Sequence, residues 1–149
     1  SRGILPALLK EQPKSIVIAN RTVEKAERIA KEFSSNALQT SKSSNLIASS
    51  LSFEALKDFE FDVVINATSV STNPSQNLNL DESVFRNTSL ALDLYYSQAF
   101  TPFMDLADRA KVPNVIDGWG MLVEQAAESF FLWTGFKPDT SELIAKHGE

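Results

Sequence analysis

The sequence predicts an α/β fold with a mostly parallel sheet, because strand-like and helix-like segments alternate along its 149 residues. Two short runs with β-branched residues, 15–19 and 61–66, are predicted as strands, and the first is typical of a strand that is covered on both faces. Apolar residues at helical spacing follow the first run directly, and this alternation favours right-handed crossovers between parallel strands. The length suits an ordinary domain with a substantial core.

In the first half of the chain, a helix over residues 3–10 is expected before the first strand. A second helix begins after Thr22, which is placed as its N-cap. Its apolar residues recur at positions i, i+3, i+4 and i+7, namely Ala26, Ile29, Ala30 and Phe33. Residues 34–50 are rich in Ser and Asn, so we expect a surface connection there, with a short strand near 46–48.

In the second half, strands are predicted at 61–66, 89–94 and 114–117, and helices at 53–57, 102–110, 121–133 and from 139 toward His147. Thr101 followed by Pro102 is a favoured helix start, and Gly135 is a favoured helix end. The helix over 121–133 is apolar on more than one face, so we expect it to lie between two layers. His147, the sole histidine, lies in a polar tail and is expected to be solvated.

Composition excludes several classes of function. The net charge of −5 offers no general attraction to nucleic acid or to anionic membranes. No apolar run reaches the roughly 18 residues that a membrane span needs. The chain has no cysteine, which excludes disulfides and fits a reducing compartment, so we expect a cytoplasmic protein. We find no metal-ligand cluster, Walker loop or arrangement typical of a catalytic triad.

The start of the chain reads as the second half of a βαβ unit, so we expect a first strand and its phosphate-binding turn before it. In such units an acidic residue about 20 positions after the glycine turn binds the ribose 2′-hydroxyl. That place is occupied here by Asn20, Arg21 and Thr22, with Lys25 one helical turn beyond Arg21. These donors and cations fit a 2′-phosphate, and the same stretch also fits a surface turn with an ordinary N-cap.

Polar residues also follow the later strands. Asn66, Thr68 and Ser69 come after the strand at 61–66, at the edge where open α/β sheets bind ligands. Tyr96 follows the next strand and either offers its phenol to a ligand or packs with its hydroxyl in water.

Two further features lie around the start of the helix at 121–133. Gly118 and Gly120 indicate either a backbone that something flat approaches closely or a tight strand-to-helix turn. Gln125 is the one amide among the apolar residues of the helix. It needs a partner, a substrate hydroxyl or a backbone group, because an unpaired buried amide costs about 1–3 kcal/mol.

Taken together, five stretches resemble the shikimate dehydrogenase family over nearly the whole chain: "SRGILPALL", "NRT", "NATS", "DLYYSQAFTPF" and "DGWGMLVEQAAESFFLWTG". The resemblance implies NADP-dependent reduction of 3-dehydroshikimate to shikimate in aromatic amino-acid biosynthesis. It implies an incomplete Rossmann-like fold, in which residues 1–117 bind NADP but lack the first strand and the glycine-rich turn. Residues 118–149 would be C-terminal helices that pack toward an absent substrate domain.

The resemblance also assigns roles to residues. Asn20, Arg21, Thr22 and Lys25 would hold the 2′-phosphate, Thr68 and Ser69 would lie along the cofactor, and Leu94, Gly118 and Met121 would lie near the nicotinamide. Tyr96 and Gln125 would bind the shikimate substrate. The family's catalytic lysine and aspartate belong to the missing part, so this chain is expected to hold no catalytic residue and to be inactive alone. Trp119 departs from the leucine or tyrosine that is common in the family.

The helix over 121–133 lacks its second packing layer in this chain, and this predicts exposed apolar side chains. Phe130, Phe131 and Trp133 would be exposed in the chain alone, so we expect either a homodimer through the C-terminal helices or a rearrangement of those helices.

A second possible function is a stand-alone module that binds a nucleotide or a protein without catalysis. Two enzyme classes are disfavoured by the residues themselves. Arg21 argues against an NAD-dependent quinate/shikimate dehydrogenase, and "NRT" with "DGWGML" argues against a methyltransferase.

Overall fold

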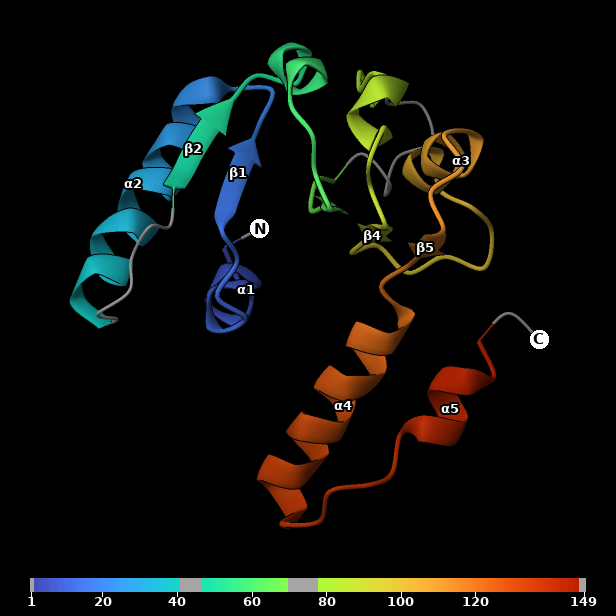
Figure 1. Cartoon of the computed structure of the whole chain (residues 1–149). Helices are drawn as coiled ribbons and strands as arrows, with labels where there is room; N and C mark the ends of the chain where they lie inside the picture. Colours follow the sequence, from blue (N-terminus) through green and yellow to red (C-terminus); the bar gives the residue numbers. More distant parts are fainter. Residues whose placement is uncertain (1, 41–46, 70–77, 148–149) are drawn as a thin grey trace. The chain divides into compact units, whose positions relative to one another are not determined.

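The computed structural model of the chain describes residues 2–40, 47–69 and 78–147 (Figure 1). Its contacts divide the chain into two units. The first comprises Ser1–Phe59 with Asn79–Val84, and the second comprises Glu60–Leu78 with Phe85–Glu149. Among the described residues every strand pairing is parallel, which confirms the predicted α/β class with a parallel sheet.

The first unit is a two-stranded parallel sheet with helices against it. Strand β1 (Ser15–Ala19) pairs with β2 (Ile47–Leu51) in a register that sets Ser15 opposite Ile47. The other elements of this unit are α1 (Leu5–Lys10), α2 (Val23–Thr40) and the 3-10 helix η1 (Glu54–Asp58). Its core consists of Leu5, Ile18, Ala26 and Ala30, with Leu8, Ile16, Ile29 and Phe33 packed around them. The predicted apolar stripe of α2 is therefore confirmed.

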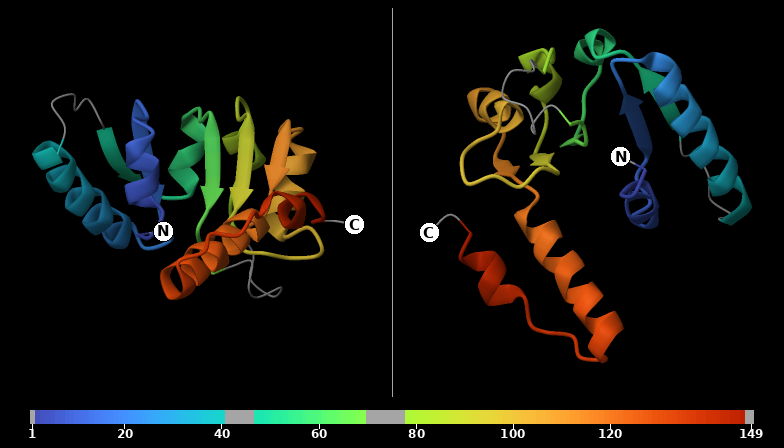
Figure 2. Two further views of the ribbon diagram at one scale, coloured as in Figure 1. Left: turned by 90° about the horizontal axis from the view of Figure 1, so that it is seen from below. Right: turned by 180° about the vertical axis from the view of Figure 1, so that it is seen from behind.

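The second unit contains a three-stranded parallel sheet, which Figure 2 shows with its strands side by side and pointing the same way. The strands are β3 (Val63–Asn66), β4 (Leu90–Asp93) and β5 (Asn114–Ile116). The helices are α3 (Pro102–Arg109), α4 (Trp119–Thr134) and α5 (Ser141–Ala145). A further 3-10 helix, η3 (Glu82–Phe85), is not predicted from the sequence, and of its residues only Phe85 belongs to the second unit. Phe85 packs edge-on against Phe103 of α3, with ring centroids 5.5 Å apart, and both rings are buried.

Two α-helices extend beyond their predicted bounds. Helix α2 continues to Thr40, through residues that we expect to be a surface connection. Ser and Asn are weak helix formers, but extending an existing helix is easy compared with starting one. Helix α4 begins at Trp119, so Gly120 lies in its first turn and not in the preceding loop. Gly135 ends α4 as predicted, in the left-handed conformation with φ of 74°.

Helix α4 leaves much of its apolar surface uncovered. Only Val123 and Ala127 are buried among its residues. Its large exposed side chains are Leu122, Phe130, Phe131, Leu132 and Trp133, and Phe136 beyond its end is exposed too. This confirms the expectation that Phe130, Phe131 and Trp133 are exposed in the chain alone. In the described part of the chain, no helix combines the length and the apolar character needed to cross a membrane.

Candidate functional site

The second unit brings three strand ends to one edge of its sheet. Because β3, β4 and β5 are parallel neighbours, their carboxyl ends lie together. The backbone N–H of Leu94 donates to the carbonyl of Asn66 at 3.0 Å, which joins the first two ends. The N–H of Gly118 donates to the carbonyl of Tyr95 at 3.2 Å, which joins the second and third. The loops that carry Thr68, Ser69, Leu94, Tyr96 and Gly118 therefore follow strand ends on one edge of the sheet.

The loop after β3 is organised by a buried amide. Asn66 is 4% exposed, and its Oδ1 accepts hydrogen bonds from the Thr68 N–H at 3.1 Å and the Thr68 hydroxyl at 2.7 Å. The hydroxyl of Thr68 therefore points toward Asn66 in this structure. Ser69 is exposed at the end of the described part of the loop.

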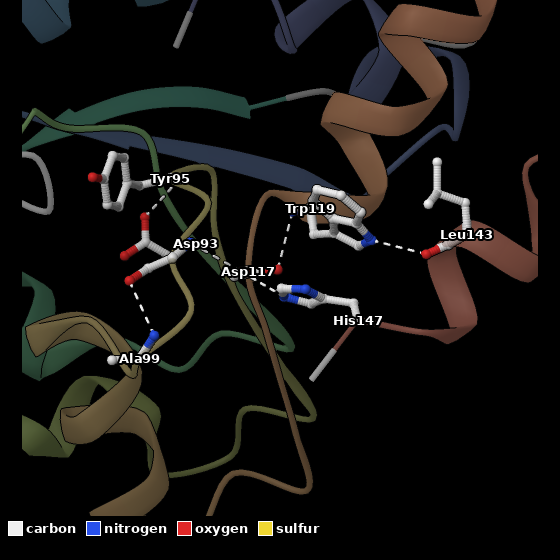
Figure 3. Close-up of polar contacts among 8 residues, drawn as sticks. Asp93, Tyr95, Ala99, Asp117, Trp119, Leu143 and His147 are labelled. Atoms are coloured by element: carbon white, nitrogen blue, oxygen red, sulfur yellow. Dashed lines mark hydrogen bonds and ion pairs between the residues drawn. The ribbon is translucent and has the colours of Figure 1, made fainter. Parts of the chain in front are cut away.

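The loop after β4 depends on a buried carboxylate that sequence analysis did not identify. Asp93 is fully buried, and its Oδ2 accepts a hydrogen bond from the Thr101 hydroxyl at 2.6 Å. Its Oδ1 accepts from the Tyr95 N–H at 3.0 Å (Figure 3). Thr101 in turn accepts from the Met104 N–H and so caps α3, as predicted. These hydrogen bonds link the end of β4, the loop at Tyr95 and the start of α3.

The turn after β5 is closed by contact with the chain itself. A Cβ added to Gly118 would lie 2.3 Å from the carbonyl oxygen of Leu94 and 3.3 Å from the carbonyl carbon of Tyr95. The backbone that approaches this glycine is therefore that of the β4 loop. Of the two interpretations of this motif, the tight strand-to-helix turn describes the structure.

Two predicted site residues lie on the first two turns of α4. Met121 is half-buried and Gln125 is exposed, and their four-residue spacing puts them on one face of the helix. The expectation that Gln125 is a buried amide is wrong for this chain, because the apolar residues around it on α4 are themselves mostly exposed. Because Gln125 is exposed to solvent, its amide incurs no desolvation cost and requires no hydrogen-bond partner within the protein.

The predicted phosphate-binding residues belong to the first unit. Asn20 directly follows β1, and its Oδ1 accepts a hydrogen bond from the Thr22 N–H at 2.9 Å. The backbone of Lys25 donates to the Thr22 carbonyl at 3.0 Å in the first turn of α2. The side chains of Arg21 and Lys25 are exposed. This end of β1 therefore presents two cations beside the N-terminus of an 18-residue helix, an arrangement that favours a bound anion.

The expectation that His147 is solvated is wrong. Its Nε2 lies 2.9 Å from Oδ2 of Asp117, and its ring stacks on Trp119. Sequence analysis missed this contact because the two partners are 30 residues apart and no local pattern joins them. Among the described residues, no group of three or more histidine, aspartate or glutamate side chains is placed to hold a metal ion.

Comparisons with known proteins agree with this architecture. A family described as Shikimate / quinate 5-dehydrogenase matches residues 1–96, and a family described as Shikimate 5′-dehydrogenase C-terminal domain matches residues 118–145. The shikimate dehydrogenase (NADP(+)) of Nitrosospira multiformis is 42% identical over 144 residues, which cover 97% of this chain and 49% of that protein. The chain spans about half the length of the curated relatives it matches.

Solved structures give the same result. An Ael1 enzyme from Pseudomonas putida is 36% identical with a TM-score of 0.79, over 99% of this chain and 50% of that one. A shikimate dehydrogenase solved in complex with NADP+ is 32% identical with a TM-score of 0.68, over 91% of this chain and 47% of that one. The parallel strand topology and these matches together make the fold Rossmann-like. The chain belongs to the shikimate / quinate 5-dehydrogenase family.

Proposed function

We propose that this chain is the NADP-binding part of a shikimate dehydrogenase, which reduces 3-dehydroshikimate to shikimate with NADPH. The proposal is supported by relatives that are named NADP(+) shikimate dehydrogenases and by a structural neighbour in complex with NADP+. The chain spans about half of those relatives, and we propose that the complete activity belongs to a longer protein that contains it. By the resemblance, the family's catalytic lysine and aspartate lie outside this chain, so we expect the chain alone to be inactive.

The observation that carries the proposal is the exposed guanidinium of Arg21, directly beyond Asn20 at the end of β1. An NAD-binding member of this fold class places a carboxylate here for the ribose 2′-hydroxyl. Asn20 offers an amide instead, and Arg21 and Lys25 offer fixed positive charge. A guanidinium binds a phosphate through paired, charge-assisted hydrogen bonds, which favours NADP over NAD.

The strand ends of the second unit would bind the remainder of the cofactor, including its nicotinamide. We propose that Thr68 and Ser69 lie along the cofactor and that Leu94, Gly118 and Met121 border its nicotinamide. When bound, the nicotinamide supplies the hydride, and the protein supplies orientation and electrostatics. The close approach of Gly118 to the backbone of the β4 loop leaves no room for a side chain at this position.

Substrate contacts are proposed for Tyr96 and Gln125, which offer a phenol and an amide to the hydroxyls or carboxylate of shikimate. Tyr96 follows β4 and is half-buried, whereas Gln125 is exposed on α4. We propose that residues 118–149 pack against the substrate domain of the longer protein. That domain would cover the exposed apolar side chains of α4.

The test of this proposal is the cofactor preference of the full-length gene product that contains this chain. Shikimate oxidation should proceed with NADP+ and much more slowly with NAD+. Arg21→Ala should lower kcat/KM for NADP+ by about 10- to 100-fold, since a hydrogen bond to a charged group contributes about 1.5–3 kcal/mol. The value for NAD+ should change by less than about twofold, because NAD+ has no 2′-phosphate to lose.

Arg28→Ala is the matched control, since Arg28 is an exposed arginine within α2, about two helical turns beyond Arg21. Arg28→Ala should leave kcat/KM unchanged for both NADP+ and NAD+. An equal loss for NADP+ and NAD+ in Arg21→Ala would contradict a 2′-phosphate role. Absence of shikimate oxidation with either cofactor would contradict the proposed reaction itself.

The uncovered face of α4 predicts self-association of the 149-residue chain. Leu132, Trp133 and Phe136 are 80%, 81% and 64% exposed, and exposed apolar side chains promote association in water. Sedimentation equilibrium at high protein concentration should therefore detect a homodimer. The double variant Leu132→Ser, Trp133→Ser should sediment as a monomer.

Phe100→Ser serves as the control, because Phe100 is also exposed, at 53%, but precedes α3 and lies outside the α4 surface. It should leave the association unchanged. A wild-type chain that stays monomeric throughout would show that the α4 face does not drive pairing.

A further inference from the structure

Asp117 joins three segments of the second unit at the end of β5. Its side chain is 5% exposed. Its Oδ1 accepts a hydrogen bond from the Trp119 N–H at 3.0 Å, and its Oδ2 accepts from the Ser97 N–H at 3.2 Å. The same Oδ2 lies 2.9 Å from His147 Nε2, which carries the hydrogen because a carboxylate can only accept (Figure 3). One carboxylate thus holds the loop after β4, the first turn of α4 and the segment after α5.

Three rings pack together beside this carboxylate. The His147 imidazole stacks on the Trp119 indole, with centroids 5.1 Å apart and planes 18° apart. The Tyr96 ring lies against both, with centroids 4.9 Å from Trp119 and 5.5 Å from His147. The orientation of the Tyr96 ring is therefore limited by two neighbours, one from α4 and one from beyond α5.

Further contacts keep α5 beside α4, where Figures 1 and 2 also show it. The Thr140 hydroxyl donates to the Glu124 carboxylate, and the Trp119 indole N–H donates to the Leu143 carbonyl at 3.2 Å. At the start of α5, the Ser141 N–H and hydroxyl hold the pKa of Asp139 below its ordinary value. His147 is thus the last of several attachments and not a frayed end.

We propose that Asp117 and His147 are positioning residues that hold the Tyr96 side chain ready for the substrate. The inference rests on the proposed function in one respect, namely that Tyr96 binds shikimate. A side chain that is already ordered need not be immobilised when the ligand arrives, so its contact contributes more to affinity. His147 lies beyond the residues matched by the family's C-terminal domain, which end at 145. The support that His147 gives to Tyr96 therefore comes from a residue outside the part of this chain that matches the family.

Three substitutions of His147 separate its hydrogen bond from its ring. His147→Phe keeps a ring beside Trp119 and loses the N–H. His147→Gln keeps an N–H donor and loses the ring, and His147→Ala loses both. Lys146→Ala is the control, because Lys146 is the exposed neighbouring residue.

The first readout needs no ligand. In NMR spectra of the 149-residue chain, the Tyr96 ring protons lie in the ring currents of Trp119 and His147. His147→Ala and Asp117→Asn should both shift these resonances, whereas Lys146→Ala should leave them unchanged. Unchanged Tyr96 resonances in His147→Ala would overturn the proposal. If His147→Ala fails to fold, His147→Phe and His147→Gln are measured instead. Unchanged Tyr96 resonances in both variants would then overturn the proposal.

The second readout is kinetic and uses the full-length gene product. His147→Ala should raise KM for shikimate about three- to tenfold, with kcat and KM for NADP+ within about twofold of wild type. Loss confined to kcat, or an unchanged KM for shikimate, would overturn the positioning role. Absence of shikimate oxidation in the wild type would contradict the proposed function, and the NMR result would still decide whether Asp117 and His147 hold Tyr96.

Discussion

Replacing Gly118 with alanine should lower the free energy of unfolding by about 3 kcal/mol, at the upper end of the range for overpacked sites. The added Cβ would lie 2.3 Å from the Leu94 carbonyl oxygen and 2.8 Å from its carbonyl carbon. Both atoms are backbone, so no side-chain rotation relieves the overlap. The turn after β5 and the loop after β4 would have to move apart. Urea unfolding measures the loss, and the amide resonances of Tyr95 and Gly118 would report the displacement.

Gly120→Ala provides a control with the opposite sign. Gly120 lies in the first turn of α4, and a Cβ there would meet only Ile144 Cγ2 at 3.9 Å, an ordinary contact. Alanine in a helix is favoured over glycine by about 0.5–1 kcal/mol, so this variant should be slightly stabilised. Equal destabilisation by both substitutions would mean that the two glycines share a requirement other than the contact at Leu94.

Replacing Thr101 with valine should destabilise the chain by a similar amount, about 3 kcal/mol, through two lost hydrogen bonds. The hydroxyl donates to the buried Asp93 carboxylate at 2.6 Å and accepts from the Met104 N–H at 3.2 Å. Valine has the same shape but leaves the carboxylate with one donor fewer in a site without water contact. It also removes the N-cap of α3. The change is measured by urea unfolding at constant m-value.

Thr101→Ser keeps the hydroxyl and removes only a methyl group. It should cost less than about half as much as the valine variant, because both hydrogen bonds can still form. If serine and valine destabilise equally, packing of the methyl group and not the hydroxyl bonds to Asp93 would account for the role of Thr101.

Local chemistry was enough to predict much of this fold. The bounds of β1 agree with the predicted strand, because the apolar run is bordered by polar residues on both sides. Thr101 with Pro102 correctly predicts the start of α3, since both the side-chain cap and the fixed proline φ act within one turn. The parallel topology also follows from the alternation of elements. It places the loops at 66–69, 94–96 and 117–118 on one edge of the second unit.

What sequence reasoning missed depends on contacts between distant residues. Asp93 is fully buried on the same face of β4 as Ala91, and nothing in the local sequence signals the burial of this carboxylate. Its partner Thr101 lies beyond the loop, eight residues away. The contact of His147 with Asp117 spans 30 residues, and nothing local distinguishes this histidine from a solvated one. The length of α2 was missed because weak helix formers at 34–36 were interpreted without the helix that precedes them.

The most direct test of the 2′-phosphate site uses the 149-residue chain and two nucleotides that differ only in that group. Adenosine 2′,5′-bisphosphate and adenosine 5′-monophosphate are titrated separately, and amide shifts are followed by NMR. The bisphosphate should shift the amides of residues 20–25, and the monophosphate should leave them in place at the same concentration. Equal shifts with both nucleotides, or none with either at millimolar concentration, would contradict the claim that Arg21 and its neighbours recognise the phosphate that distinguishes NADP from NAD.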